Sequence, residues 1–185
     1  MKTIAFRTGL IVVWVCMGIS GAALYGILND QITVTLCPEY FSVFKREQFA
    51  PALEQMGLLN APTRIQALLV GTLATSWFGL LVCVVLSIGG LACRRPSWST
   101  RRYVRAVGGI MLFAFCVSVL LGSVAYIVEP FVKPLGDQWP FLRGIHSVRR
   151  AFAVGFWHDG AYLGGFSATI AALLRVRRQR ILSEP

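Results

Sequence analysis

The stretch "IQALLVGTLATSWFGLLVCVVLSIGGLA", residues 65–92, contains no charged side chain. A bilayer core about 30 Å thick is crossed by about 20 mainly apolar residues in a helix. A helix also bonds its backbone groups internally, which lipid requires. The stretch therefore predicts a membrane-spanning helix. Similar apolar stretches predict further spans at residues 5–28, 104–128 and 151–174.

The composition agrees with a membrane protein. The 185-residue chain is 56% hydrophobic and 14% charged, whereas soluble domains are about 45–50% apolar and about 25% charged. Its length suits a single domain. We therefore predict an all-α fold in which residues 1–185 form one integral membrane four-helix bundle. The first two spans are joined by an extramembrane loop of about 35 residues.

Lysine and arginine set the expected orientation, because they concentrate on the cytoplasmic side of a membrane. If the N-terminus lies inside, eleven of the 18 basic residues fall on that side. The bias predicts a multi-pass protein with both termini cytoplasmic. The basic runs "CRRPSWSTRRYVR" (93–105) and "RVRRQR" (175–180) should meet anionic headgroups. We interpret them as topology anchors rather than as a lipid-specific site.

The first span also resembles a signal peptide. Lys2 and Arg7 precede an apolar run that ends in "SGAAL", and cleavage after Ala23 is the alternative to a retained span. The apolar character continues to Leu28, which favours a retained helix. The net charge of +10 raises the question of nucleic acid, but the basic residues flank apolar runs and leave no basic soluble face. The lipid bilayer is the expected partner, and nucleic acid is not.

The five cysteines form no CxxC pair, so neither a structural zinc site nor a redox motif is predicted. Cys37 alone falls in the expected outer loop, where an intermolecular disulfide is the alternative to a free thiol. His146 and His158 supply too few ligands for a metal or a haem. We therefore predict neither a metal nor a cofactor.

Small residues recur every fourth position, a pattern that lets membrane helices approach closely. The pattern includes Gly18, Ala22 and Gly26 in the first span, Gly71, Thr75 and Gly79 in the second, and Gly160 and Gly164 in the fourth. We favour packing within the chain, and a homo-oligomer seam is the alternative. The segments "GAALYG" (21–26) and "GSVAYI" (122–127) also suggest a faint duplication of the two halves.

The fourth span carries His158 and Asp159 within "FWHDGAYLGGF", residues 156–166. A carboxylate within the membrane is costly and usually faces the bundle, where it pairs. Adjacent helical residues point about 100° apart, so the two side chains should not share one ligand easily. We predict an outer polar pocket, or alternatively a structural hydrogen-bond network. Its candidate ligand-binding residues are Tyr25, Asp30, Gln31, Tyr126, Glu129, His158, Asp159 and Tyr162.

The outer segment has two patterns. "QITVTL" (31–36) alternates polar and apolar residues, which predicts a short strand. "CPEYFSVFKREQFAPALEQMG" (37–57) predicts a helix that Pro51 interrupts. An aromatic face of Tyr40, Phe41, Phe44 and Phe49 is expected to lie on the membrane interface. The segment as a whole should form a lid over the bundle, or a docking site for a partner.

The stretches "YGILNDQITVTLCPEYFSVFK" (25–45) and "WHDGAYLGG" (157–165) resemble a family of small bacterial inner-membrane proteins. The first outer loop of that family reads Tyr-Gly-x-x-His-Asp-Gln-x-Thr-x-x-x-x-Pro-Glu-Tyr-Phe. Asn29 stands where the family pattern has histidine. The resemblance implies a four-span protein of the bacterial inner membrane and brings no activity with it.

No GxSxG, Walker or HExxH motif is present, so an enzyme is not predicted. We predict instead a non-enzymatic accessory or scaffold subunit with a polar layer at its outer face. Its partner would be another membrane protein or a second copy of the chain. The alternative is a solute, ion or proton binder or transporter that works through Asp159, Asp30 and Glu129.

Overall fold

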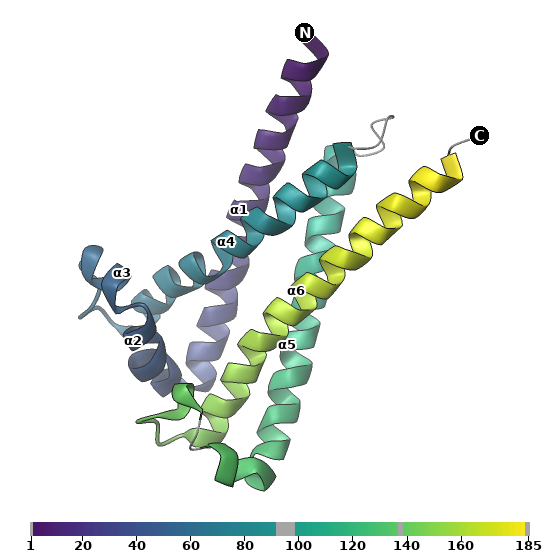
Figure 1. The fold of residues 1–185 in the computed structure, drawn as a ribbon. Coiled ribbons are helices and arrows are strands. Elements are labelled where there is room, and N and C mark those ends of the chain that lie inside the picture. The colour runs from purple at the N-terminus through teal and green to yellow at the C-terminus, as the bar shows by residue number, and fades with distance from the viewer. Residues whose placement is uncertain (1, 92–98, 137–138, 184–185) are drawn as a thin grey trace.

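The computed structural model describes residues 2–91, 99–136 and 139–183, and every regular element in these ranges is helical. Cys93 and the other residues of the basic run 93–105 up to residue 98 lie outside the described residues. Four long helices dominate the fold (Figure 1). They are α1 (Lys2–Leu36), α4 (Thr63–Leu91), α5 (Thr100–Gly136) and α6 (Val148–Ser183).

Three of these helices contain segments long and apolar enough to cross a membrane: Thr8–Leu36, Thr63–Gly89 and Thr100–Val132. Large apolar side chains such as Leu112 and Leu120 point outward along them, at 65% and 60% exposure. The chain is therefore a multi-pass membrane protein. Helix α6 is as long as the others but is less apolar, since it contains His158 and Asp159. Its role as a fourth span remains a prediction.

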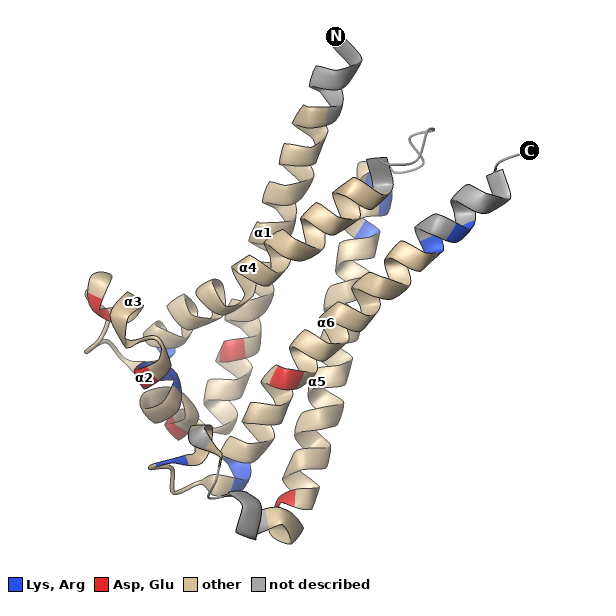
Figure 2. Cartoon of the chain, viewed as in Figure 1, with Lys and Arg blue, Asp and Glu red and all other residues tan. Residues whose placement is uncertain are grey.

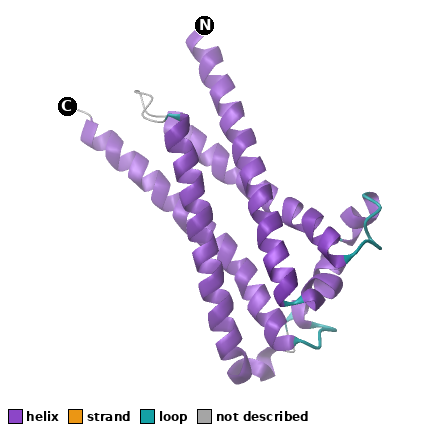
Figure 3. Cartoon of the chain, turned by 180° about the vertical axis from the view of Figure 1, so that it is seen from behind, coloured by secondary structure: helices purple, strands orange, loops and turns teal. Residues whose placement is uncertain are grey.

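The helices form two hairpins. Helix α1 packs along α4, and α5 packs along α6, while contacts between the two hairpins are sparser and come mainly from α4 and α6. Figure 3 shows the same pairing from behind. Gly26 and Gly71 bring α1 and α4 together backbone to backbone, so that a Cβ at Gly71 would lie 2.6 Å from the Gly26 carbonyl oxygen. Small residues thus give each hairpin a tight internal seam.

The two ends of the bundle differ. The start of α1, the end of α4, the start of α5 and the end of α6 lie at one end, and the short helices lie at the other (Figure 1). We call the latter the outer end. In Figure 2 the acidic residues of the described part of the chain lie in the half toward the outer end, whereas basic residues lie at both ends.

The predicted strand at residues 31–36 is wrong, because these residues form the last turns of α1. The hydroxyl of Thr33 donates to the Asn29 carbonyl at 3.1 Å, and that of Thr35 donates to the Gln31 carbonyl at 2.8 Å. Threonines that bond back to the preceding turn are compatible with a helix. The extended α1 also shortens the predicted outer loop to residues 37–62.

This connection contains a π-helical turn η1 (Tyr40–Lys45), α2 (Arg46–Gln48) and α3 (Ala50–Gln55). The chain leaves helical geometry at Phe49, with φ −108° and ψ 12°, and Pro51 lies in the first turn of α3. The predicted interruption near Pro51 is confirmed. Gly57 then reverses the chain with a φ of +67°, which favours glycine.

Two residues of the predicted aromatic face point into the protein instead of onto the membrane interface. Tyr40 and Phe41 are buried, at 3% and 2% exposure, in a core with residues from α1, α4 and α6. Cys37 lies in the same core at 0% exposure, so its thiol does not reach a second chain and the intermolecular disulfide is also wrong. The segment covers the outer end of the bundle, as the lid interpretation expected.

Candidate functional site

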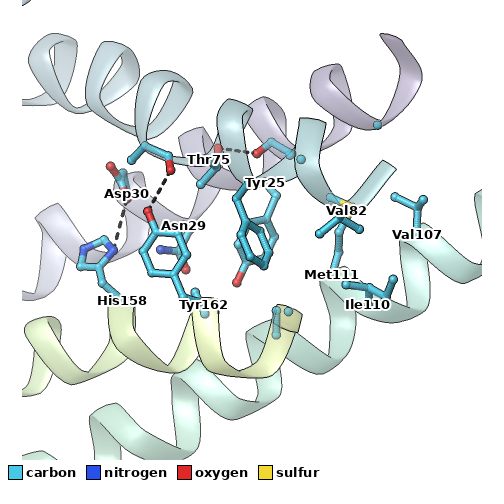
Figure 4. A pocket seen from close by; sticks show the side chains of 18 of the residues that line it. Tyr25, Asn29, Asp30, Thr75, Val82, Val107, Ile110, Met111, His158 and Tyr162 are labelled. Atoms are coloured by element: carbon cyan, nitrogen blue, oxygen red, sulfur yellow. Dashed lines mark hydrogen bonds and ion pairs between the residues drawn. The ribbon is translucent and has the colours of Figure 1, made fainter. Parts of the chain in front are cut away.

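A cleft lies between the two hairpins, with a cavity volume of about 80 Å³. That volume exceeds the roughly 10–15 Å³ that one water molecule needs. The cleft changes character along its length (Figure 4). Its outer end is polar, with Tyr25, Asn29, Asp30, Lys45, Thr75, His158 and Tyr162. Its inner end is apolar and includes Val82, Val107, Ile110 and Met111.

Asp30 and His158 form the centre of the polar end. The Nδ1 atom of His158 lies 3.8 Å from the Oδ1 atom of Asp30, and the side chains are 13% and 4% exposed. The second oxygen of Asp30 and the Nε2 atom of His158 are buried and make no hydrogen bond to another protein group. Buried polar atoms of this kind usually have a partner. The pair therefore retains bonding capacity for a ligand, an ion or water.

Aromatic rings from the outer segment enclose His158. The ring of Tyr40 stacks on the imidazole at 5.5 Å between centroids and 14° between planes, and Phe41 meets it edge-on at 6.1 Å. The π-helical turn η1 begins at Tyr40 and holds both rings. Burial raises the pKa of the Tyr40 phenol, which keeps this hydroxyl neutral. The rings thus shield the pair from water on the outer side.

Three hydrogen bonds fix the helices around the cleft. The indole N–H of Trp157 donates to Asn29 Oδ1 at 2.8 Å and joins α6 to α1. The Tyr162 hydroxyl donates to the Ala74 carbonyl at 2.8 Å and joins α6 to α4. The Thr75 hydroxyl lies 2.7 Å from the Ala22 carbonyl and joins α4 to α1. Together they hold the positions from which Asp30 and His158 project.

Lys45 lies at the mouth of the cleft. Its ammonium group donates to Gln48 Oε1 at 2.8 Å and sits 5.5 Å from the ring centroids of Phe44 and Phe49. Burial lowers the pKa of Lys45, and the negative charges of Asp30 and Asp159 act in the opposite direction. Both carboxylates therefore favour the protonated amine, whereas burial opposes it.

A second pocket of about 470 Å³ lies on the outer side of Lys45. Lys45, Ala74, His158 and Tyr162 line both this outer pocket and the cleft. Those four residues therefore form a partition between the two spaces. A solute that reached Asp30 from the outer pocket would have to pass them.

The expectation that Asp159 faces the bundle and pairs is not met. Its side chain is exposed and lines the outer pocket, while the adjacent His158 takes the inward position. One helical step turns a side chain by about 100°, so only one of the two neighbours projects toward Asp30. Asp159 lies at the rim and acts on Lys45 through its charge.

Three other candidate residues lie away from the cleft. Gln31 and Arg64 bond reciprocally, with the Gln31 amide donating to the Arg64 carbonyl at 3.0 Å, and so join α1 to the start of α4. Tyr126 is 42% exposed and stacks under the guanidinium of Arg149, 4.0 Å from its ring centroid. Glu129 is buried on α5 but does not line the cleft. Tyr25 and Tyr126, matched in the faint duplication, thus differ in their surroundings.

The candidate packing residues lie at helix contacts. Gly18 faces Cys83, and Gly79 faces Ala22, both between α1 and α4. A Cβ on Gly160 or Gly164 would lie 2.8 Å from the Cα of Ser118 or Ala114, respectively, on α5. Each of these glycines therefore serves a contact within the chain.

Sequence reasoning missed Lys45, Asn29 and Tyr40 as site residues. Asn29 was noted only because the family pattern has histidine there, and Lys45 was one basic residue of an outer segment. The "PEYF" part of the resemblance pointed to Tyr40, but nothing in the spacing places it against His158. A lysine among four aromatic residues was the available signal, since cations pack on aromatic rings.

The described residues contain no group of three or more His, Cys, Asp and Glu side chains suited to a metal ion. Comparisons with known proteins add no assignment. No protein-family model matches the chain, and neither a curated protein nor a solved structure matches it.

Proposed function

We propose that the chain is a four-span protein of the bacterial inner membrane with both termini cytoplasmic. Helix α6 is the fourth span in this proposal. Its length of 36 residues and its antiparallel packing on α5 support the assignment. His158 and Asp159, which lower its hydropathy, line the cleft or the outer pocket. Arginines at the end that holds both termini support the orientation.

We infer that the protein binds a small solute or a proton at the Asp30–His158 pair, in a non-enzymatic role. One observation carries this proposal: both side chains have a buried polar atom that no protein group satisfies. Burying such atoms is costly, so a site that retains them is a functional candidate. The ligand suited to a carboxylate and an imidazole carries a positive charge or hydrogen-bond donors.

The shape of the cleft limits the solute further. Its polar groups lie at the outer end, and apolar side chains continue from there into the inner half of the bundle (Figure 4). A solute with a cationic head and an apolar body fits this division. Asp159 at the rim of the outer pocket would attract the cationic head. Lys45 would repel the head on its way to Asp30 until the Lys45 side chain moves aside. Glu129 has no part in this version of the proposal, because it does not line the cleft.

A carbodiimide tests the central residue. Dicyclohexylcarbodiimide partitions into lipid and reacts with protonated carboxyl groups in apolar surroundings, and peptide mass spectrometry locates the adduct. We expect modification of Asp30 in purified full-length protein, and its loss in Asp30→Asn. A panel of organic cations with apolar tails should protect Asp30 in proportion to concentration. Glu47→Gln removes an exposed carboxyl group that lines neither the cleft nor the outer pocket, and this matched control should leave modification and protection unchanged.

Two results would contradict the proposal. If Asp30 stays unmodified across the pH range in folded protein, the carboxyl is closed off and the pair is structural. If the adduct appears but neither added cations nor a drop in proton concentration alters its rate, the pair does not exchange ligands. Circular dichroism in the same detergent establishes that each variant is folded.

A second candidate role is that of an accessory or scaffold subunit. One observation favours it: α3 projects beyond the bundle at the outer end (Figure 1), and Met56, the residue that follows α3, is 63% exposed. A partner membrane protein would dock there. Native mass spectrometry of protein from its own membranes in mild detergent tests this role. A stoichiometric foreign subunit that Met56→Asp releases would support it, and a chain recovered alone would contradict it.

A further inference from the structure

A third cavity, distinct from the cleft and from the outer pocket, lies at the opposite end of the bundle from the outer segment. It has a volume of about 470 Å³ and lies between the start of α5 and the end of α6. Those helices diverge toward that end in both Figure 1 and Figure 3. The cavity shares only Ile110 with the Asp30–His158 cleft, so it is a separate site.

Two kinds of side chain line this cavity. Arg102 and Arg105 come from α5 and Arg175 comes from α6, and all three are exposed. The walls below them consist of apolar and small residues, including Gly109, Phe113, Ala168 and Ala172. A Cβ at Gly109 would meet no atom within 4 Å, so this wall is open. Three guanidinium groups thus stand above an apolar groove.

This combination selects its ligand. Arginine binds phosphate with two parallel hydrogen bonds and remains charged at any physiological pH. A soluble phosphate compound would gain nothing from the apolar walls, whereas the acyl chains of a lipid would fill them. The described lining contains no acidic residue that would repel the phosphate. Basic pockets between membrane helices on the cytoplasmic side are suited to anionic headgroups.

We propose that the arginines at positions 102, 105 and 175 form a binding site for an anionic phospholipid. The phosphate lies between the guanidinium groups, and one acyl chain lies along the groove past Gly109. The proposal does not rest on the function of the Asp30–His158 cleft, and it goes beyond a general attraction of basic residues to the membrane surface.

Native mass spectrometry of the full chain in detergent tests the site. The probes are phosphatidylglycerol and phosphatidylcholine with the same acyl chains. We expect wild-type protein to retain phosphatidylglycerol in preference. Arg105→Gln with Arg175→Gln should weaken its binding by about fivefold for each arginine removed. Arg46→Gln with Arg143→Gln removes two exposed arginines at the outer end and should leave binding unchanged.

A pair of glycine variants tests whether lipid binding depends on the groove or only on the positive charge of the arginines. Gly109→Leu places a side chain in the groove, and Gly108→Leu places one beside it where a Cβ also meets no atom. Neither changes the charge, and both positions have room, so both variants should fold. We expect Gly109→Leu to weaken phosphatidylglycerol binding severalfold and Gly108→Leu to leave it unchanged.

Three results would overturn the proposal. Equal retention of the two lipids would show that the arginines select no headgroup. Equal binding of phosphatidylglycerol by both glycine variants and wild type would show that the groove holds no acyl chain. Competition by glycerol phosphate at the same concentration as the lipid would identify a soluble phosphate compound as the ligand.

Discussion

The Nδ1 atom of His158 on α6 lies 3.8 Å from the Oδ1 atom of Asp30 on α1, and this contact joins the two hairpins where they otherwise touch sparsely. Both side chains are largely buried, so neither exchanges its partner for bulk water. A change of charge on either one alters the balance of forces between the hairpins. The proposed binding site therefore lies at the interface between the two hairpins.

The hydrogen bond from Trp157 to Asn29 should contribute to stability. Trp157→Phe replaces the indole with a smaller aromatic ring, removes the donor and leaves the Asn29 oxygen without its partner. We expect the free energy of unfolding in detergent to fall by about 1–2 kcal/mol. Trp77→Phe is the control: Trp77 is 56% exposed, and the change should stay within about 0.5 kcal/mol. Equal effects of the two variants would refute a specific role for the bond.

The glycine contact between α1 and α4 should not tolerate a methyl group. Gly71→Ala places a Cβ 2.6 Å from the Gly26 carbonyl oxygen, so the helices must separate. Overpacking of this kind costs about 1–3 kcal/mol. Gly108→Ala meets no neighbour and should be neutral or stabilise the helix by up to about 1 kcal/mol. Thermal unfolding in one detergent compares them, and a stable Gly71→Ala protein would argue against the close seam.

Lys45 should control access to Asp30 from the outer pocket. Lys45→Ala removes the side chain that separates the pocket from the cleft, and a water-soluble carbodiimide should then modify Asp30 faster than in wild type. Lys45→Arg keeps a long cationic side chain, so the carbodiimide should modify Asp30 in this variant as slowly as in wild type. The readout is the time course of the adduct by mass spectrometry. Identical time courses for wild type and Lys45→Ala would place the entrance elsewhere.

The outer segment should loosen in acid. The Ser147 backbone N–H donates to the Glu39 carboxylate at 2.7 Å, and this bond lowers the pKa of Glu39 below its ordinary value of 4.5. A carboxyl group with a lowered pKa stabilises the fold above its unfolded pKa, and the stabilisation is lost as pH falls through the folded pKa. We expect the protection of amides in residues 37–62, measured against the intrinsic exchange rate at each pH, to fall once the pH drops below about 4.

Glu39→Gln should show the lower amide protection already at neutral pH, and its protection should no longer depend on acid. Glu47→Gln, in the same segment, is the control and should behave as wild type. Acid loosening that persists in Glu39→Gln would assign the effect to another group.

The orientation can be read from thiol labelling in intact cells. In a cysteine-free background, Gln48→Cys places an exposed thiol at the outer end, and Arg178→Cys places one near the end of α6. A membrane-impermeant maleimide should label the first directly and the second only after the membrane is permeabilised. If both thiols are labelled from outside, α6 does not cross the membrane. If only the thiol at residue 178 is labelled directly, the protein has the opposite orientation.

The helical fold and the first three spans were predictable, because long uncharged runs leave few alternatives in lipid. The termini of the helices were less so. Residues 31–36 alternate like a strand, but continuity with a formed helix and the back-bonding of Thr33 and Thr35 prevail over that local pattern. The extension of α1 to residue 36 therefore cannot be predicted from sequence periodicity.

The site was predictable in part. Composition and topology bring Asp30, Tyr25, His158 and Tyr162 to one end of the bundle, and all four line the cleft. Which of His158 and Asp159 points inward depends on the rotation of α6 about its axis. That rotation is set by Gly160 and Gly164 against α5, a packing detail that no spacing rule fixes. Lys45 reaches the site through the fold of the outer segment, which is irregular.

The tight internal seams of the two hairpins have a consequence for biosynthesis. Each hairpin unites two sequence-adjacent helices through glycine contacts of its own, so each can enter the membrane as an independent insertion unit. The bundle would then be completed by lateral docking of two preassembled halves. A gene divided at the connection between α4 and α5 should therefore yield two fragments that reassemble in the bilayer without a covalent link.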